Sequence, residues 1–580
     1  MATPFFDFHF HPLFKKFITH YEEDFPTKRF ANDLLNEITL SNKVATTLDD
    51  LVLHILQSQS SISQCIDGHV KLGVAAFANL EYGFGDSRGF ISNLLKGKFS
   101  DPMDKKYFEL VKNGRVSYYR MFLKELDLYR KLNGVKVKET GKIAMQMLTR
   151  KNKKDLSKIE GMGLLVSIEG GHNLYRKKIG QTLEDDIDNP AKNIEDDFYY
   201  DLQTSDEVGI NPALSLQRFF KALWKNDMDM MYLTVTHLSH ISEQFLATHA
   251  FGMKLLKHPT FFPTGNGLTT WGKEVIDACY NMEVKEKNKT VKTPVLVDIK
   301  HLGLKSRQDF YHYRKEKNYQ IPLVASHMGV TGYTLNEWKN ALRADKCKLY
   351  NYEGARTVEV QMKRKRCGTW GSFVNNDFTF NPWSINLMDE DIVEVLDSNG
   401  LIGLSLDVRI LGFQAKVGLN TGEQSEHLST SDFQSHFPYL RLSNLPAEKL
   451  ESMAVEAESW LLPTKEDRHP LALCFNIIHI AAVGIMRSTI ENPWKHICIG
   501  SDYDGLIEPV KICPDISNID DLKFNLLKWL PVAADAYQKE NGGRMVLPDT
   551  NLNALVDDIL YKNGLRFTQN WMNGTPGAVV

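Results

Sequence analysis

The chain has 580 residues, of which 43% are apolar and 24% charged, and its formal net charge is −3. This is the composition of an ordinary globular protein, and its nearly balanced charges offer no basic surface for nucleic acid or an anionic membrane. No apolar run looks long enough to span a bilayer, so we expect a small-molecule substrate and no nucleic-acid or membrane partner.

Short, mostly apolar segments recur along the chain and predict buried strands. Their continuous apolar character suits strands covered on both faces, as in a parallel sheet. Between them, 389–399 predicts an amphipathic helix closed by Gly400, and 472–489 a longer apolar helix. Alternating strands and helices predict an α/β fold, a (β/α)8 TIM-like barrel in which 1–580 form one unit. The eight predicted strands are 4–9, 69–77, 163–168, 230–236, 294–299, 321–326, 401–406 and 496–500.

Four connections are longer than a barrel requires and are predicted to be insertions. The last three follow predicted strands three, six and seven, so they lie at the rim where such barrels keep their active sites. They fit a lid over the site, and they fit equally well solvated loops or oligomer contacts. A basic run at 363–366 resembles a polyanion-binding patch, although a solvated loop is the plainer interpretation. The insertions span roughly 96–160, 180–211, 329–383 and 412–470.

Several apolar segments finish on a residue that can bind a metal ion. Residues i and i+2 of a strand share a face, so His9 and His11 can both point at one ion. The carboxyl ends of parallel strands meet at one rim, where these side chains would converge. The other segments end on Glu169, His237, His301, His327 and Asp502.

Imidazole and carboxylate groups together suit zinc and similar divalent ions. Two ions about 3.5–4 Å apart need a bridging ligand, which a carboxylate can supply. The sequence therefore predicts a site for two Zn²⁺. His9 and His11 are assigned to one ion, His301 and His327 to the other, and Glu169 to the bridge.

Asp502 is the predicted catalytic residue, which accepts a proton from the attacking water and passes it to the leaving group. Each candidate also has a plainer interpretation. A single strand-end histidine is more often a hydrogen-bonded rim group, Asp502 could cap the turn at 503–505, and Glu169 could simply begin a loop. The occurrence of the whole set at one predicted rim favours the metal site.

The seven cysteines are scattered, odd in number and without a CxxC pair. This pattern predicts reduced thiols in a reducing compartment. The amino terminus shows no basic region followed by a long apolar stretch, so we expect no signal peptide and a cytoplasmic location.

With these residues laid out, the chain resembles the membrane (renal) dipeptidase family of the amidohydrolase superfamily. The resemblance implies a metal-dependent hydrolase of dipeptide-like amides, and it implies that His237 contacts substrate near the metals. Homodimers are frequent among the resembling proteins. The ordered motifs that carry the resemblance are DxHxHP at 7–12, SIEG at 167–170, LTVTH at 233–237, GLTTWG at 267–272, DIKH at 298–301, ASH at 325–327, NLMDE at 386–390 and GSDYDG at 500–505.

Two departures from the family pattern bear on specificity. The opening motif is usually HxD, whereas His11 replaces the carboxylate and leaves the site with one fewer negative charge. The family's arginine for the substrate carboxylate is replaced by Ile385, and an aliphatic side chain cannot form a bidentate anion clamp. Arg409 is a candidate substitute for substrate binding, against the plainer interpretation of a surface arginine paired with Asp407.

Three functions remain open on the sequence. The first is a hydrolase of a peptide-like C–N bond, and the second an amidohydrolase-type lactonase, esterase or cyclic amidase, which the HxH opening favours. The third is a catalytically retired barrel that only binds a ligand or partner. The intact Asp502 and ligand set argue against the third, because binding alone requires neither.

Overall fold

A computed structural model gives the structure of the protein. It describes residues 3–19, 34–38, 49, 57–87, 107, 111–112, 118–152, 155–174, 211–240, 246–253, 258–286, 289–370, 377–412, 422–449, 468–542, 546–548 and 551–574.

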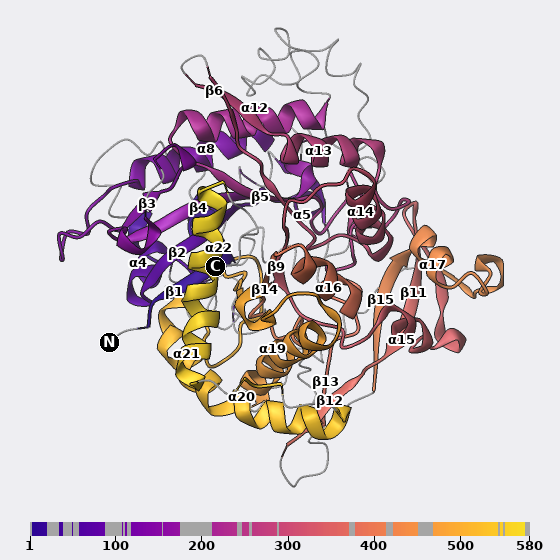
Figure 1. Ribbon diagram of the computed structural model, residues 1–580. Coiled ribbons are helices and arrows are strands. Elements are labelled where there is room, and N and C mark those ends of the chain that lie inside the picture. Colours follow the sequence, from indigo (N-terminus) through magenta and orange to yellow (C-terminus); the bar gives the residue numbers. More distant parts are fainter. Residues whose placement is uncertain are drawn as a thin grey trace, which may run out of the picture.

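Parallel strands of the described residues close into a barrel (Figure 1). β2 pairs with β4 on one side and with β1 on the other, and β1 pairs with β17, so the ring is complete. The predicted (β/α)8 fold class and all eight predicted strands are confirmed. In barrel order, which is also chain order, the strands are β1 Phe5–Phe10, β2 Val70–Phe77, β4 Met162–Glu169, β5 Met230–Thr234, β8 Leu296–Asp298, β9 Leu323–Met328, β14 Leu401–Leu404 and β17 Ile497–Ile499. An unpredicted strand, β3 Met145–Met147, pairs with β4 outside the ring.

Helices lie between the strands in chain order and surround the barrel. The side chain of Asn211 caps α12 by accepting from two backbone N–H groups, and Pro212 follows at the first helical position. The predicted helix at 389–399 is α16, whose acidic first turn suits the positive end of the helix dipole. It ends at Asp397, and the left-handed residue after it is Asn399 rather than Gly400. The main helices are α4 Ile62–Asp67, α8 Tyr118–Leu132, α12 Pro212–Lys225, α13 Thr270–Tyr280, α14 Leu304–Glu316, α16 Asp389–Asp397, α19 Arg468–Arg487 and α20 Ile519–Asn541.

The predicted apolar helix at 472–489 is α19. Within the described residues it is the helix long and apolar enough to cross a membrane, but 89% of its most apolar stretch is buried inside the structure. It packs against α16 and α20, so its apolar surface is accounted for by the core.

The amino-terminal end of the barrel is closed by the last helix, α22 Asn563–Met572. Trp571 and Met572 pack with Phe6 and Phe8 of β1 in the apolar interior of the barrel. Gly564 permits the close approach of this helix, because a Cβ at that position would lie 1.9 Å from the ring of Phe6. With this end filled by α22, the open end of the described barrel is its carboxyl-terminal rim.

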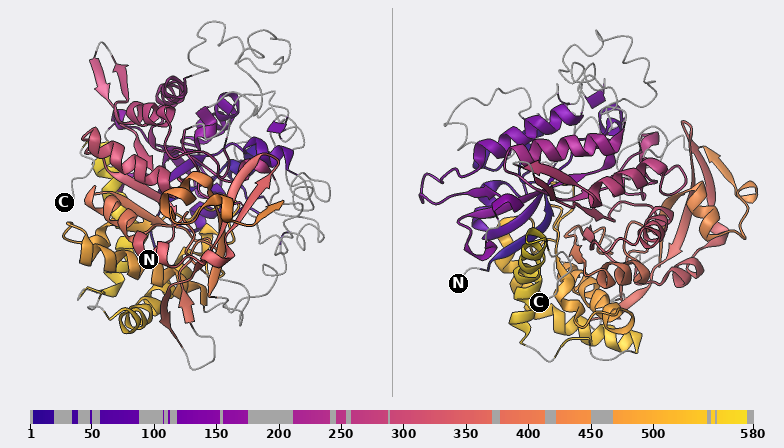
Figure 2. Two further views of the ribbon diagram at one scale, coloured as in Figure 1. Left: turned by 90° about the vertical axis from the view of Figure 1, so that its right-hand side faces the viewer. Right: turned by 45° about the horizontal axis from the view of Figure 1, so that its top comes forward.

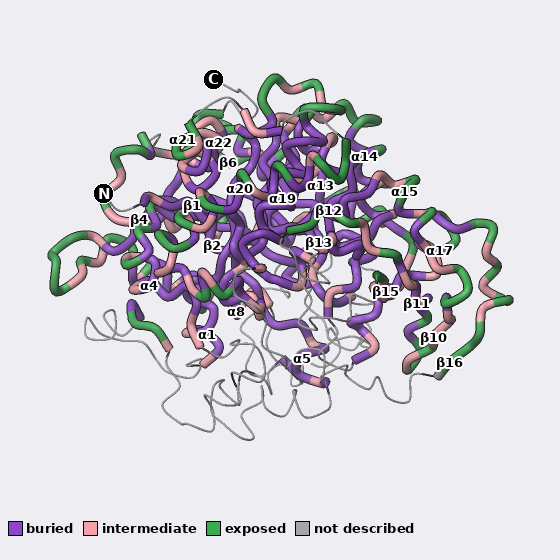
Figure 3. The backbone as a smooth tube through the Cα atoms, turned by 90° about the horizontal axis from the view of Figure 1, so that it is seen from below, coloured by how far each residue is buried: buried purple, intermediate pink, exposed green. Residues whose placement is uncertain are grey.

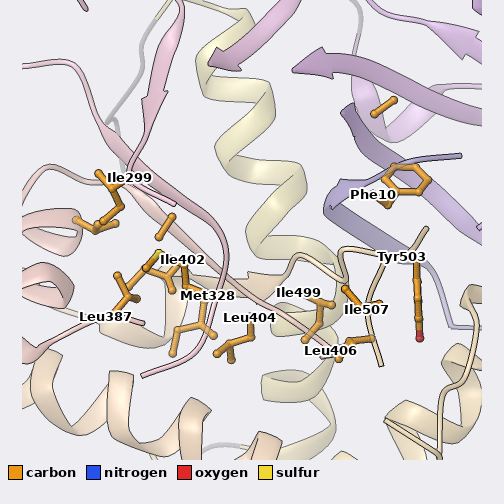
Figure 4. Packing of buried hydrophobic residues seen from close by; sticks show 14 of the residues in the cluster. Phe10, Ile299, Met328, Leu387, Ile402, Leu404, Leu406, Ile499, Tyr503 and Ile507 are labelled. Carbon is orange, nitrogen blue, oxygen red and sulfur yellow. The ribbon is translucent and has the colours of Figure 1, made fainter. Parts of the chain in front are cut away.

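The apolar core lies between the barrel wall and its helices. The centre of the molecule is buried, and exposed residues lie at its periphery (Figure 3). Met328 of β9, Ile402 and Leu404 of β14, and Ile499 of β17 gather in one apolar layer (Figure 4). This layer holds in register the strands that carry the rim residues.

The predicted insertions 329–383 and 412–470 contribute a second sheet on the flank of the barrel (Figure 2). Its strand order is β15-β11-β10-β16, with its own apolar core around Trp338 and Phe433. The sheet consists of β10 Lys348–Tyr352, β11 Ala355–Lys363, β15 Glu423–Ser429 and β16 Ala447–Lys449. The predicted insertion 180–211 lies outside the described residues except for Asn211, and 96–160 contains α8 and β3.

The basic run at 363–366 is not a solvated loop, so that interpretation was wrong. It joins the end of β11 to β12 Arg366–Thr369. Arg364 donates to Thr379 and Gln424, and its burial lowers its pKa to about 10. Lys365 pairs with Glu337 and Arg366 with Glu540. The side chains of Arg364, Lys365 and Arg366 are thus engaged within the protein, whereas Lys363 is exposed.

All seven cysteines are buried and free, which confirms the prediction of reduced thiols. The cellular compartment stays a prediction.

Candidate metal centre

The five predicted metal ligands meet at the carboxyl-terminal rim, around the carboxylate of Glu169. Its Oε1 lies 3.3 Å from Nε2 of His9, 3.3 Å from Nε2 of His301 and 3.4 Å from Nε2 of His327. Its Oε2 lies 3.4 Å from Nε2 of His11. Glu169 ends β4, His9 lies in β1 and His11 directly follows it, and the others follow β8 or lie in β9. The predicted convergence is therefore present.

Hydrogen bonds on the far side of two rings determine which nitrogen carries the proton. Nδ1 of His9 lies 2.8 Å from the hydroxyl of Tyr232, whose own proton goes to the carbonyl of Phe8. Nδ1 of His11 lies 3.1 Å from the carbonyl of Ala76, which can only accept. Both rings must therefore donate from Nδ1, and in the neutral form each presents an Nε2 lone pair to Glu169.

A similar chain orients His327. Its Nδ1 donates to Ser326 Oγ at 2.8 Å, and that hydroxyl donates to Asp298 at 2.6 Å. Asp298 also accepts from Thr234 of β5. The Nε2 lone pair of His327 is then left to face Nε2 of His301, 3.3 Å away. Such outer partners are typical of histidines that bind metals.

With neutral rings, the inward-facing Nε2 atoms of His9, His11 and His327 and the carboxylate oxygens of Glu169 are buried acceptors. Nε2 of His9, Nε2 of His11 and Oε1 of Glu169 have no hydrogen-bond partner in the described structure. Burial lowers the pKa of His327 and of His301 well below the ordinary histidine value, which keeps both rings neutral. Each unsatisfied buried group costs about 1–3 kcal/mol. Lone pairs of imidazole and carboxylate are the donor set of a divalent cation, so the residues present fit such an ion.

Asp502 lies at the open side of the cluster. Its Oδ1 is 3.5 Å from Nε2 of His11, and its Oδ2 is 3.8 Å from Nε2 of His327. The side chain is 15% exposed, whereas that of Glu169 is 2% exposed. Asp502 and His301 both have φ of 65°, in the left-handed region that non-glycine residues rarely occupy. The surrounding structure therefore keeps both residues in a strained backbone conformation.

Backbone hydrogen bonds join the motif at 7–12 to the motif at 500–505. Asp502 donates its N–H to the carbonyl of His9, and His11 donates to that of Tyr503. Asp7 accepts from the N–H and hydroxyl of Ser501 and from the N–H of His9. Asp7 therefore anchors the backbone of the strand that carries His9. Its burial raises its pKa to about 7.

The grouping of ligand atoms refines the predicted assignment. His9 and His11 share a group with Asp502, whose ligand atoms lie within 4.8 Å of one another. Glu169 and His301 form a second group with His237, which the resemblance had placed at the substrate. A third group joins His9, Glu169 and His327, so Glu169 is shared between this group and the second.

The two predicted substrate-binding residues differ in their surroundings. Nε2 of His237 faces Oε1 of Glu169 at 3.7 Å, and its side chain is 14% exposed. Arg409 donates to both oxygens of Asp407 and to the carbonyl of Leu506. The plainer interpretation, pairing with Asp407, is confirmed, although the arginine is only 20% exposed. Ile385 packs in a small apolar cluster with Ala250, Trp383 and Ile410.

Sequence reasoning missed three residues beside the centre. Tyr232 reads as an ordinary apolar strand residue, and nothing in the sequence signals its bond to His9. Lys300 is buried between Asp298 and His301, hidden inside a motif. Glu81 lies four residues beyond β2 and accepts from Nδ1 of His237 at 2.7 Å. Glu81 could have been found, because it follows a predicted strand at the same rim.

Comparisons with known proteins place the chain near one group of structures. No protein-family model and no curated protein matches it. Similar solved structures include dipeptidases and an amidohydrolase. The metallopeptidase titled dipeptidase AC, of family M19, is 12% identical with a TM-score of 0.37, and the match covers 100% of each chain.

Two further similar structures come from named organisms. The probable dipeptidase PvdM from Pseudomonas aeruginosa is 12% identical with a TM-score of 0.42, over 99% of this chain and 96% of that one. A metallopeptidase from Rhodobacter sphaeroides, liganded with a phosphinate mimic of L-Ala-D-Ala, is 12% identical with a TM-score of 0.36, over 99% and 100%. At these TM-scores the likeness decides nothing about the substrate of this chain.

Proposed function

We propose that the protein is a metal-dependent hydrolase that cleaves the amide bond of a small, dipeptide-like substrate. The observation that carries the proposal is the set of Nε2 lone pairs directed at Glu169 with Asp502 beside them. The ordered motifs of the sequence support the same class of reaction.

His9, His11, Glu169, His301 and His327 would hold the metal, which we propose to be two Zn²⁺ ions. When bound, the metal lowers the pKa of a water molecule to roughly 7 and polarises the scissile carbonyl. The protein supplies the remaining chemistry. Asp502, the more exposed carboxylate, accepts the proton of the attacking water and returns it to the leaving nitrogen.

His237 is proposed to contact the substrate beside the metals, since its ring lies at the inner edge of the cluster and is reachable from outside. Arg409 is proposed to meet a substrate carboxylate, although Asp407 already accepts three hydrogen bonds from its guanidinium. A substrate carboxylate bound there would have to share the guanidinium of Arg409 with Asp407.

A second candidate is a lactonase, esterase or cyclic amidase with an uncharged substrate. Two observations favour it: apolar Ile385 is packed where the family carries its arginine, and Asp407 neutralises Arg409. Both candidates use the same metal centre and the same base, but they differ in the bond that is cleaved and in the charge of the group beyond it.

A substrate panel tests the proposal. The purified protein, supplied with Zn²⁺, Co²⁺ or Mn²⁺, is assayed with a dipeptide, its carboxy-terminal amide, an ester and a lactone. Cleavage of the dipeptide that Asp502→Asn abolishes supports the first candidate. Cleavage of the ester or lactone alone supports the second. A protein that binds metal and turns over none of them contradicts both and leaves the retired barrel.

A further inference from the structure

Glu81 is buried behind His237, on the side away from the metal centre. It follows β2 and immediately precedes α5 Tyr82–Asp86, and it is 1% exposed. Its Oε1 accepts from Nδ1 of His237 at 2.7 Å and from the backbone N–H of Leu238 at 3.1 Å. One carboxylate oxygen therefore fixes both the ring and the backbone that carries it.

The consequence of this bond is a fixed direction for the other ring nitrogen. With Nδ1 held by Glu81, the opposite ring nitrogen, Nε2, points toward Oε1 of Glu169, 3.7 Å away. The ring of His301 lies edge-on at 4.7 Å between centroids, and the ring of His172 is stacked at 6.1 Å on the other side. His172 is itself held by the carbonyl of Asn79 at 2.7 Å. The imidazole is thus confined on three sides.

We propose that Glu81 is the positioning residue for His237, which it holds with Nε2 directed at the reacting group of the substrate. This inference rests on the proposed function, in which His237 contacts substrate. Glu81 cannot touch substrate itself, because it is buried and His237 stands between it and the cluster. Any effect of Glu81 on the reaction must therefore act through His237. This effect requires Oε1 of Glu81 to accept the hydrogen bond from Nδ1.

The test uses Glu81→Ala, Glu81→Gln and His237→Ala in the full chain. Glu81→Ala removes the acceptor, and we expect kcat to fall about 100-fold with KM nearly unchanged, since orientation acts mainly in the transition state. Glu81→Gln keeps an acceptor oxygen and should restore kcat to within about tenfold of wild type. Metal content should be unchanged in both, because Glu81 contacts none of the five proposed ligands. Asp391→Ala, which removes another buried carboxylate bonded to a backbone N–H, is the matched control and should leave kcat near wild type.

A double-mutant cycle separates positioning from a merely structural role. In a His237→Ala background, adding Glu81→Ala should change kcat less than twofold, because the residue it positions is gone. Equal losses in the two backgrounds, or wild-type kcat in Glu81→Ala, would overturn the inference.

A spectroscopic readout keeps the test independent of turnover. In protein labelled with ¹⁵N-histidine, the Nδ1 proton of His237 should give a protected resonance that Glu81→Ala removes and Glu81→Gln retains. An unaltered resonance in Glu81→Ala overturns the inference. If wild type cleaves no substrate, the proposed function fails, and this resonance still decides whether Glu81 holds the ring.

Discussion

The hydroxyl of Tyr232 lies 2.8 Å from Nδ1 of His9, and this hydrogen bond determines which ring nitrogen faces Glu169. Tyr232 gives its own proton to the carbonyl of Phe8. Its oxygen can therefore only accept from Nδ1–H of the histidine, which leaves Nε2 of the neutral ring unprotonated with a free lone pair. A residue inside β5 thus prepares a ligand on β1, across the interior of the barrel.

Tyr232→Phe should weaken metal binding about 10- to 100-fold, the usual effect of losing an outer partner of a ligand histidine. The ring of Phe fills the same space, so the fold should persist. Competition with a chromogenic chelator measures the affinity. Tyr280→Phe, at the end of α13, is the matched control; an equal loss there, or no loss at position 232, would contradict the role of the hydroxyl.

Lys300→Met should strengthen metal binding, by roughly tenfold for one like charge removed near the site. Lys300 is 2% exposed and adjacent to His301. Burial and the charge of Lys300 lower the pKa of His301, and the same charge would oppose a bound cation. The chelator assay checks this, with Lys305→Met on α14 as the control. Weaker binding in Lys300→Met would show that the ammonium supports the centre instead.

Asp502→Asn should retain metal and lose about 10²–10⁴-fold in kcat, because the amide cannot accept the proton of the attacking water. Elemental analysis and turnover of the best panel substrate are measured on the same preparation. Asp515→Asn, further along the segment, is the control. Turnover within threefold of wild type would remove Asp502 from the reaction.

Acid should destabilise the protein through buried histidines such as His249. Burial lowers its pKa to about 3, from the ordinary 6.5, so the unfolded chain binds the proton more readily. Stability is then fully present above pH 6.5 and is lost as the pH falls toward 3, by about 1.4 kcal/mol per pH unit for this group. Chemical denaturation at stepped pH should give a shallower slope for His249→Gln. Exposed His312→Gln should keep the wild-type slope, and identical slopes for all three proteins would refute the prediction.

The barrel and the convergence of its ligands were predictable because both follow from local patterns. Continuous apolar segments indicate strands buried on two faces, and the carboxyl ends of parallel strands share a rim. Glu169, His301 and His327 could therefore be placed together without knowledge of the loops between them.

Other features of the structure could not be predicted from the sequence. The partner of His9 is an aromatic residue within an apolar strand, so only the closed barrel reveals it. The second sheet was taken for loops because β10 and β11 are half exposed and mix charges with apolar residues. Periodicity gives the strand face on which Asp7 lies, but the partner of Asp7 is Ser501, which is 494 residues away.

The most direct test of the metal centre is the metal content of the purified protein, measured by mass spectrometry after incubation with Zn²⁺ and removal of free ions. The centre built around Glu169 predicts up to two tightly bound divalent ions per chain in wild type and a lower content in Glu169→Gln. A wild-type protein that retains none, or a Glu169→Gln variant that retains as much as wild type, would contradict it.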